Sequence, residues 1–573
     1  METPPPVLSE KAWLRRPGEY PGERPTWHEV LLVIPAVLPL FLNLGILQVT
    51  GSEARWLLIA RDMEKTGQLL EPRIEGEFYG DKPLISYWTI LLAALPSGRV
   101  DEAAGRLPSA VAGAVSGFLT LWLAARLLGR RASVLAAWIL LTSFSFFVWS
   151  RTASADLLSV AFSTAAVAVY IEWSREFRPW KVIFFFLLLA VGGHVKGMPG
   201  VLVPLGIVGA DLVLSLGTHV GHPRFRTRLL VQGIWVALGC LLASALYFVP
   251  FYLSYLERGD WQLLYLAYKE NFLRAFDAYD HVAPPYYYLW ILPLMFLPWG
   301  LLLPGAVGWA ARWFRQNAGL RFCLVAFAVT FIEFTASESR RSYYIIPAFP
   351  FCALLVAGFL SGVVTFLESG KPPGRAWLVL ASYPLFLLAA ALALGAAFFL
   401  TAPFLSGPLG QLGREFPLAL PLGSALVAML VLWVVAWRGR NPVGLVAAGA
   451  IAALTFTLYF SLGGDVLRAR ALSERPFAQE VRSRFPDTQV VYFRGKNTRL
   501  SYYLGTGPVV KTFEEARDLL EEGRGEVLLV LSEDDIKDTW PPDFAEVIRT
   551  ERPAFGFLSR PNVRFTLLRC TKK

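Results

Sequence analysis

Apolar residues in this chain fall into long continuous runs rather than into the short alternating patterns of a soluble domain. A helix needs about 20 apolar residues to cross the hydrocarbon core of a bilayer. We find thirteen such runs; the fifth is short and the seventh long, so twelve or fourteen spans also fit. The runs cover residues 30–48, 106–125, 132–150, 155–173, 181–194, 198–216, 229–255, 285–305, 320–336, 343–366, 376–399, 418–437 and 443–462. They predict an all-α polytopic membrane domain at 30–463, after a tail at 1–29.

Polar residues interrupt these runs most extensively in two long loops, at 49–105 and 256–284. Within the first loop, residues 52–69 have the pattern of an amphipathic helix. A second predicted helix at 83–95 is too short to span a bilayer, so we expect it to lie along the interface.

The pattern changes sharply after about residue 464. Residues 490–493 and 526–531 predict strands, and 513–523 predicts a helix. We therefore expect residues 464–573 to form a soluble α/β domain.

Composition agrees with a membrane protein and argues against a nucleic-acid partner. Only 17% of the residues are charged, whereas about 25% is usual for soluble domains. The net charge is +10, but residues 464–573 hold 19 Lys and Arg against 17 Asp and Glu, which is only +2 of it. The other +8 belongs to the apolar body, mostly in short loops, which is typical of membrane orientation rather than of nucleic-acid binding.

The distribution of Lys and Arg predicts the direction of the spans. With a cytoplasmic N-terminus, the cytoplasmic loops carry sixteen basic residues and the short outer loops carry five: Arg151, Lys196, Arg340, Arg341 and Arg414. This asymmetry follows the positive-inside rule. An odd number of spans then places the C-terminal domain on the outer side of the membrane.

Acids, cations and tyrosines from five outer loops collect on the predicted outer side. Ionisable groups are costly in lipid, so a cluster of them at the lipid–water boundary could host a polar reaction on a lipid-borne substrate. The alternative interpretation is that each is an ordinary solvated loop residue. Arg340 and Arg341 are two adjacent outer cations that call for an anionic partner such as a lipid phosphate.

The segments around these residues resemble, in order, the motifs of the C-type glycosyltransferases, which use a polyprenyl-phosphate sugar donor. The similarity is greatest to the aminoarabinose-to-lipid A transferases and the protein O-mannosyltransferases. It covers about residues 28–370 and is specific as an ensemble. The segments are Glu53–Trp56, Phe78–Trp88, Ala104–Ala112, Arg151–Asp156, His194–Pro199, Glu270–Phe276, His281–Tyr288, Pro298–Trp299 and Arg341–Pro350.

The resemblance implies a multi-pass membrane glycosyltransferase that modifies a cell-envelope acceptor, which could be lipid A, another glycolipid, a polysaccharide or a protein. An acceptor oxygen would attack the anomeric carbon with inversion, helped by a carboxylate. Cations would hold the leaving lipid phosphate. No nucleotide is needed, since the donor bond is already activated.

The resemblance also implies roles for individual residues. Glu53 and Asp156 are the candidate catalytic carboxylates. Lys82, Arg274, Tyr344, Arg340 and Arg341 are the candidate ligands of the donor phosphate. Further candidates are Asp81, Lys196, Glu270 and His281. A divalent metal is a possible cofactor, although Asn271 stands where the family would have His.

The largest departure from the family pattern is Ser52, which stands where the family has an Asp before Glu53. The base could then be Glu53 or Asp156, or the protein could bind a lipid-linked sugar without turning it over. A flippase or transporter of lipid-linked sugars is the remaining alternative. It is disfavoured because transporters place ionisable residues near the bilayer midplane, whereas these lie at one boundary.

Overall fold

The structure is a computed structural model of the chain. It describes residues 22–74, 76–219, 225–273, 281–370, 374–406, 414, 419–439, 441–466, 469, 474–486, 488, 490–495, 498–505, 507–521, 526–532, 541, 543–549 and 565–571. Arg274 and most of the predicted N-terminal tail lie outside the described residues.

Helices occupy each of the thirteen predicted apolar runs. In the described part of the chain, eight helical segments are long and apolar enough to cross a membrane: Glu102–Leu127, Asp156–Arg175, Pro179–Lys196, Leu230–Arg258, Ala318–Ala336, Ser342–Glu368, Ala419–Arg438 and Pro442–Gly464. They correspond to α5 (Glu102–Leu127), α8 (Asp156–Arg175), α9 (Pro179–Lys196), α11 (Phe225–Arg258), α16 (Ala318–Ala336), η4 and α17 (Ser342–Ala348 and Phe349–Glu368), α20 (Ala419–Arg438), and α21 with η6 (Pro442–Tyr459 and Phe460–Gly464).

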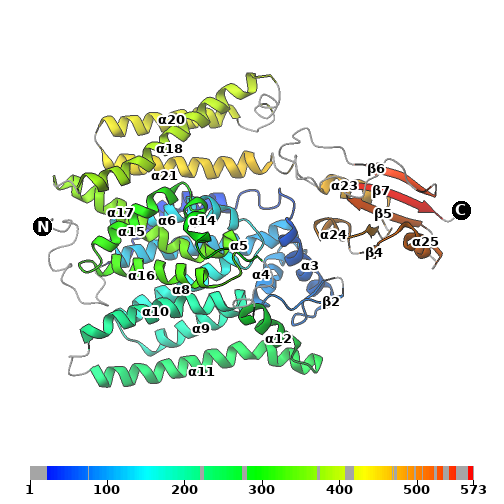
Figure 1. Ribbon diagram of the computed structural model, residues 1–573, viewed down its shortest axis with the longest axis horizontal. Helices are drawn as coiled ribbons and strands as arrows, with labels where there is room; N and C mark the ends of the chain where they lie inside the picture. The colour runs from blue at the N-terminus through cyan, green and yellow to red at the C-terminus, as the bar shows by residue number, and fades with distance from the viewer. Residues whose placement is uncertain are drawn as a thin grey trace.

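The other predicted spans are filled by further helices. These are α2 and η1 (Trp27–Val37 and Leu38–Leu40), α6 and α7 (Arg130–Thr142 and Phe144–Trp149), α10 (Met198–His219), α14, η3 and α15 (Tyr287–Met295, Trp299–Leu302 and Leu303–Arg312), and α18 with η5 (Arg375–Thr401 and Ala402–Phe404). Figure 1 shows α18, α20 and α21 as a layer on one side of the bundle and α9, α10 and α11 on the other.

Two runs predicted as single spans are interrupted, at Ser143 and near Leu297, and the two interruptions meet. The N–H of Phe144 donates to the carbonyl of Leu297 at 2.8 Å. The indole N–H of Trp299 donates to the Thr142 hydroxyl at 3.0 Å. Backbone groups freed inside a membrane need partners within the protein, and here each break supplies the partner of the other.

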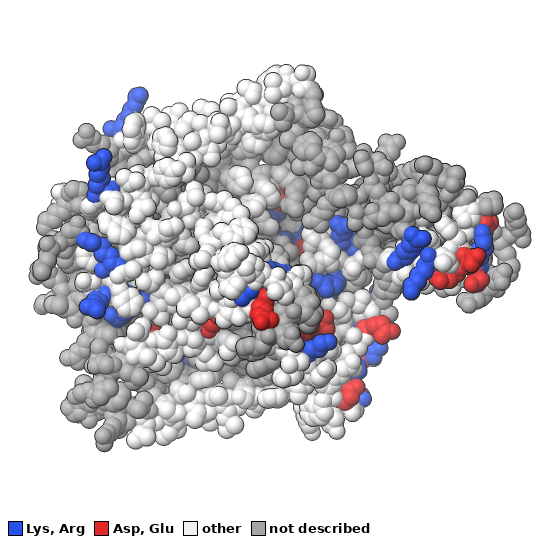
Figure 2. All heavy atoms as spheres, in the orientation of Figure 1, with Lys and Arg blue, Asp and Glu red and all other residues white. Residues whose placement is uncertain are grey.

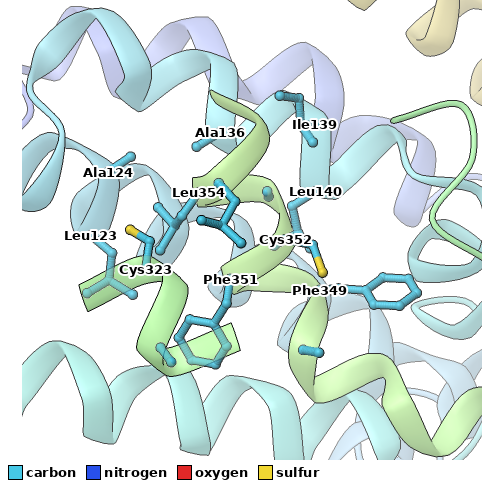
Figure 3. Packing of buried hydrophobic residues seen from close by; sticks show 14 of the residues in the cluster. Leu123, Ala124, Ala136, Ile139, Leu140, Cys323, Phe349, Phe351, Cys352 and Leu354 are labelled. Atoms are coloured by element: carbon cyan, nitrogen blue, oxygen red, sulfur yellow. The ribbon is translucent and has the colours of Figure 1, made fainter. Parts of the chain in front are cut away.

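The core of the bundle lies between α5, α6, α16 and α17. Figure 3 shows Cys323 and Cys352 pointing into it among Leu123, Leu140 and Leu354. Both cysteines are buried and neither forms a disulfide. Their packing is that of small apolar residues, which agrees with their place in apolar runs.

The predicted amphipathic helix is α3 (Gly51–Thr66) and the short predicted helix is α4 (Ile85–Ala94). Thr50 begins α3 with a capping box, in which its hydroxyl accepts from the Glu53 N–H and the Glu53 carboxylate accepts from the Thr50 N–H. Gly67 ends the helix with a φ of 72°, the left-handed conformation favoured by glycine.

Between α3 and α4 the chain forms a short hairpin of β1 (Arg73–Ile74) and β2 (Glu77–Phe78). The second long loop contains α12 (Gln262–Tyr268) and the π-helical turn η2 (Lys269–Leu273). These elements lie at the same end of the bundle as α3 and α4 (Figure 1).

The C-terminal part contains a five-stranded sheet in the order β4-β3-β5-β7-β6. Strands β4 (Val509–Val510), β3 (Val490–Phe493) and β5 (Glu526–Ser532) are parallel. Strand β7 (Phe565–Thr571) pairs antiparallel with β5, and β6 (Phe544–Arg549) pairs antiparallel with β7 at the edge. Helices α23 (Arg475–Arg484) and α24 (Thr498–Leu504) cover one face, and α25 (Phe513–Glu521) covers the other. An α/β sheet domain is thus present, as predicted.

Candidate functional site

Glu53 is the most completely bonded of the predicted site residues. Its side chain is only 2% exposed. Arg106 of α5 contacts both carboxylate oxygens, with Nε 2.8 Å from Oε1 and Nη2 3.1 Å from Oε2. Two backbone groups also donate to it, the Thr50 N–H at 2.7 Å and the Ala153 N–H at 2.9 Å. Both oxygens are therefore committed to contacts within the protein.

The balance of these contacts determines the pKa of Glu53. Burial alone would raise it, but the charge and hydrogen bonds of Arg106, with the two backbone N–H groups, hold the pKa below its ordinary value. A carboxylate stabilised in this way is a weak proton acceptor. The geometry therefore favours Glu53 as a group that orients its neighbours.

Arg106 extends the same network to the chain that precedes α3. Its guanidinium donates to the carbonyls of Leu44, Leu47 and Gln48 at 2.7 to 2.9 Å. The sequence placed Arg106 in a family-like motif but gave it no role. The sequence did carry a signal for Arg106, which lies one turn into an apolar helix. An arginine buried in such a place requires a partner.

Asp156 begins α8 and forms an ion pair with Lys196 at the end of α9. Asp156 is only 6% exposed. The Lys196 ammonium also lies over the ring of Tyr344, 5.2 Å from its centre. Three predicted site residues from different elements therefore meet here.

Helices α9 and α10 approach each other closely at two glycines, next to the turn that carries Lys196. A Cβ on Gly200 in α10 would lie 2.2 Å from the carbonyl oxygen of Gly192 in α9, a distance that no side chain allows. Gly197 makes the turn between the two helices with a φ of 76°.

Arg341 and His281 lie beside each other, next to the Asp156 cluster. Arg341 contacts the His281 ring, and its Nη1 donates to the hydroxyl of Tyr343 at 3.0 Å. Tyr343 in turn stacks on Trp149 with ring centres 4.1 Å apart. The end of the second long loop and the short segment 337–342 are thereby joined. An isolated bridge between Val282 and Ser339 reinforces the junction.

Arg340 points elsewhere. It is 8% exposed, and its guanidinium donates to the carbonyls of Thr335 and Ala283. These contacts satisfy Arg340 with loop backbone. A role of Arg340 on a phosphate stays a prediction and would require it to exchange these partners.

Lys82 lies between the two long loops. Its ammonium is 3.3 Å from Oε2 of Glu270 in η2 and 3.2 Å from the carbonyl of Asp81. The Lys82 side chain is 37% exposed, so unlike Arg340 it is accessible to a ligand. Lys82 of the first long loop and Glu270 of the second therefore lie together.

A pocket opens beside Lys82 with mostly apolar walls. Its polar residues are Asp81, Lys82 and His194, and the rest of its lining is Gly80, Pro83, Leu84, Tyr247, Pro250, Phe251, Leu263 and Ala267. His194 is held there by a hydrogen bond of 2.7 Å between its Nε2 and the Tyr247 carbonyl oxygen. One cation beside apolar pocket walls suits a ligand with an anionic head and an apolar portion.

These groups belong to one end of the molecule. The Ser86 hydroxyl of α4 donates to the Val195 carbonyl at 3.0 Å, which ties the Lys82 loop to the turn carrying Lys196. The Ala153 contact ties Glu53 to the segment leading into Asp156. On its visible face, Figure 2 shows acids and bases mixed at this end, while Lys and Arg predominate at the opposite end of the bundle.

A second buried pair near the site was not anticipated. Arg151, which the sequence assigned to an outer loop, donates to Asp465 at 2.6 Å and to the Pro39 carbonyl at 2.6 Å. The side chains of Arg151 and Asp465 are 6% and 1% exposed. Asp465 lies more than 300 positions later in the chain, so sequence spacing gave no indication of it. Among the described residues no group of three or more His, Cys, Asp or Glu is placed to hold a metal.

The amino-acid sequence is similar to those of known membrane glycosyltransferases over part of its length. Residues 42–257 match the family model described as dolichyl-phosphate-mannose-protein mannosyltransferase. An undecaprenyl phosphate-alpha-4-amino-4-deoxy-L-arabinose arabinosyl transferase of Edwardsiella ictaluri is 30% identical over 353 residues, which are 60% of each chain. An uncharacterised protein of Aquifex aeolicus is 29% identical over 337 residues, 58% of this chain and 64% of its own length. The alignments thus span less than two thirds of these relatives.

The similarity of fold extends further than that of sequence. The crystal structure of ArnT from Cupriavidus metallidurans bound to undecaprenyl phosphate superposes with a TM-score of 0.70 at 18% identity, covering 94% of this chain and 97% of that one. The same protein in its apo state gives 0.69. The chain is therefore a multi-pass membrane protein with the fold of a C-type glycosyltransferase, and in sequence it resembles the aminoarabinose transferases and the protein mannosyltransferases.

Proposed function

We propose that this protein transfers a sugar from a polyprenyl-phosphate donor to an acceptor on the outer face of the bacterial inner membrane, with inversion at the anomeric carbon. The observation that carries the proposal is the Lys82 pocket, in which one accessible ammonium stands beside an apolar wall from α11 and α12. The relatives named for undecaprenyl phosphate-linked aminoarabinose support a donor of this class.

The reaction follows from the groups around the pocket. An acceptor oxygen forms a bond to the anomeric carbon while the bond from that carbon to the phosphate oxygen breaks, and polyprenyl phosphate leaves. Lys82 balances the charge that grows on the phosphate. Tyr344 and Arg341 are proposed as further donors to it. Arg274 remains a family-based candidate for the same role.

Asp156 is the carboxylate that we favour for orienting or deprotonating the acceptor. Its ion pair with Lys196 engages Oδ1 alone, whereas Glu53 has donors on both oxygens. A hydroxyl acceptor would pass its proton to this carboxylate, and a phosphate acceptor would need only orientation. Lipid A, another glycolipid, a polysaccharide and a protein are the acceptor classes in question.

We further propose that the N-terminus is cytoplasmic and that residues 464–573 form a periplasmic domain, with loops 49–105 and 256–284 on the same side. The concentration of Lys and Arg at the opposite end of the bundle supports this direction. A Val509→Cys variant in a Cys240→Ser background tests it, because Val509 is exposed. Labelling of intact spheroplasts by an impermeant maleimide supports the topology, and labelling only after lysis reverses it.

Turnover tests the activity itself. The purified protein in detergent is incubated with undecaprenyl-phosphoryl sugar and an envelope lipid extract, and undecaprenyl phosphate is quantified by mass spectrometry. Release of undecaprenyl phosphate with a matching mass increase on an acceptor supports transfer. Binding of donor without release would support a lipid-sugar binding protein, an alternative that Ser52 in place of Asp keeps open. Movement of intact donor from one leaflet of a vesicle membrane to the other would support a flippase.

A further inference from the structure

The C-terminal domain packs into the core of the first outer loop through α24. Tyr502 is 3% exposed and belongs to the same apolar cluster as Ala54, Leu57 and Ala60 of α3. Arg61 lies over its ring at 3.7 Å and donates to its carbonyl at 2.8 Å. A residue of the domain is thus part of the core that supports α3.

Glu102 in the first turn of α5 anchors the next side chain of α24. Its Oε1 accepts from the Tyr503 hydroxyl at 2.9 Å and from Arg475 Nη2 at 2.6 Å. The Tyr503 oxygen also accepts from the Val49 N–H at 3.1 Å, just before α3. At the start of α23, the Glu474 N–H donates to Gln48 Oε1 at 2.6 Å. Tyr503 therefore bonds the starts of both α5 and α3.

Glu102 lies close to the candidate site along α5. Glu102 and Arg106 are four residues apart on α5, so their side chains share a helix face. Arg106 holds Glu53, and Glu53 holds the Ala153 N–H, three residues before Asp156. Gln48 connects the two groups, because its side chain accepts from the Glu474 N–H and its carbonyl accepts from Arg106. Polar contacts through Gln48 therefore join the C-terminal domain to the segment that carries Asp156.

We propose that the C-terminal domain is a positioning element of the site: docking of Tyr503 and Arg475 on Glu102 fixes α3 and α5 so that Arg106 and Glu53 hold the 151–156 segment in place. Tyr503, Glu102 and Arg106 are positioning residues in this scheme and touch no substrate. The inference deepens the proposed function, since Asp156 is the carboxylate being positioned.

Two adjacent tyrosines provide a matched experiment. Tyr503→Phe removes a hydroxyl with two partners, whereas Tyr502→Phe removes a buried hydroxyl that has no hydrogen-bond partner among the described residues. Hydrogen exchange of the full-length protein in detergent, resolved to peptides covering 151–156, is compared for both variants and for Glu102→Gln. This readout needs no turnover, so it is independent of whether transfer is observed.

We expect exchange at the Ala153 amide to become about tenfold faster in Tyr503→Phe and in Glu102→Gln, the size expected from losing one hydrogen bond to a charged group. Tyr502→Phe should exchange like the wild type. If transfer is active, the first two variants should lower kcat while leaving the affinity for undecaprenyl phosphate unchanged. Unchanged exchange at 151–156 in both variants, with faster exchange in α24, would overturn the proposal, because docking would then be lost without effect on the site.

Discussion

Arg106 and Glu53 form a two-pronged ion pair at the junction of α5 and α3, in which neither side chain is more than 4% exposed. Buried charges of this kind are held by mutual contact, and the loss of one leaves the other without compensation. We expect Arg106→Met to lower the free energy of unfolding by about 3–5 kcal/mol. The double variant Arg106→Met/Glu53→Gln should be less destabilised than Arg106→Met alone, because no buried charge is then left unpaired.

Thermal unfolding in detergent measures these differences in stability, with loss of the monodisperse peak as the signal of unfolding. Arg99→Met is a suitable control, because the Arg99 side chain is 78% exposed and its pairing with Asp101 is at the surface. Equal melting temperatures of Arg106→Met and the control would contradict the interpretation of the pair as a structural anchor.

The lowered pKa of Glu53 predicts that the stability of the protein falls at acid pH. In the unfolded chain Glu53 takes up a proton near its ordinary pKa of 4.5, whereas the folded protein resists protonation until lower pH. Its contribution is therefore fully present above about pH 4.5 and is lost as the pH falls through the folded value. Melting temperature measured from pH 7 to pH 3 should fall less steeply in Glu53→Gln than in the wild type. If the melting temperatures of the two proteins fell in parallel with pH, Glu53 would not contribute to the loss of stability in acid.

Asp156→Asn and Glu53→Gln should affect the reaction differently. Loss of a base or orienting carboxylate typically costs 10²- to 10⁴-fold in rate, so we expect kcat of Asp156→Asn, measured on the folded fraction, to fall by about that factor. Glu53→Gln should act through lower stability and should retain the wild-type pH dependence of kcat. A larger loss of kcat in Glu53→Gln, with a normal melting temperature, would make Glu53 the catalytic group instead.

If Lys82 holds the donor phosphate as proposed, Glu270 and that phosphate would compete for the same ammonium. Because Glu270 is 3.3 Å from Lys82, a bound phosphate must displace or share that contact. Lys82→Ala should weaken binding of undecaprenyl phosphate, and Glu270→Gln should leave it unchanged or strengthen it, as measured by quenching of intrinsic fluorescence. Weaker binding in Glu270→Gln would mean that Glu270 itself contacts the ligand.

The pair formed by Arg151 and Asp465 should be a further stability determinant. It joins the end of α7 to the segment after α21, with both side chains buried. Asp465→Asn should lower the free energy of unfolding by about 3–5 kcal/mol, because Arg151 would remain as a buried cation. Melting temperature in detergent checks this, with Glu526→Gln, which breaks a half-exposed pair with Arg569, as the control. Similar melting temperatures for the two variants would contradict it.

Continuous apolar runs were sufficient to predict the helices, because membrane spanning depends mainly on local hydrophobicity. The starts of α3 and α4 were also predictable from local signals. The interruptions at Ser143 and near Leu297 were not, since each is stabilised by a contact with the other, 150 residues away. In the C-terminal domain, the apolar strands β3 and β5 were predicted, whereas β4, β6 and β7 were not.

Some charged residues that the motifs singled out lie together in the structure. Lys196 and Asp156 form one ion pair, and Lys82 and Glu270 form another. Their catalytic and binding roles stay predictions. The sequence could not show that Glu53 is saturated by Arg106, or that Arg340 is taken up by loop carbonyls, because both facts depend on which distant groups are adjacent. Motif resemblance indicates which residues are near a site, and the contacts decide how each is used.

The meeting of the two interrupted helices also constrains how this membrane domain can change. A substitution that restored regular helix at Ser143 would withdraw the Phe144 N–H and leave the Leu297 carbonyl without this donor. Straightening one helix would therefore destabilise the other, so the two irregularities can be lost only together. We expect compensating changes at these positions, rather than single ones, wherever this architecture is altered.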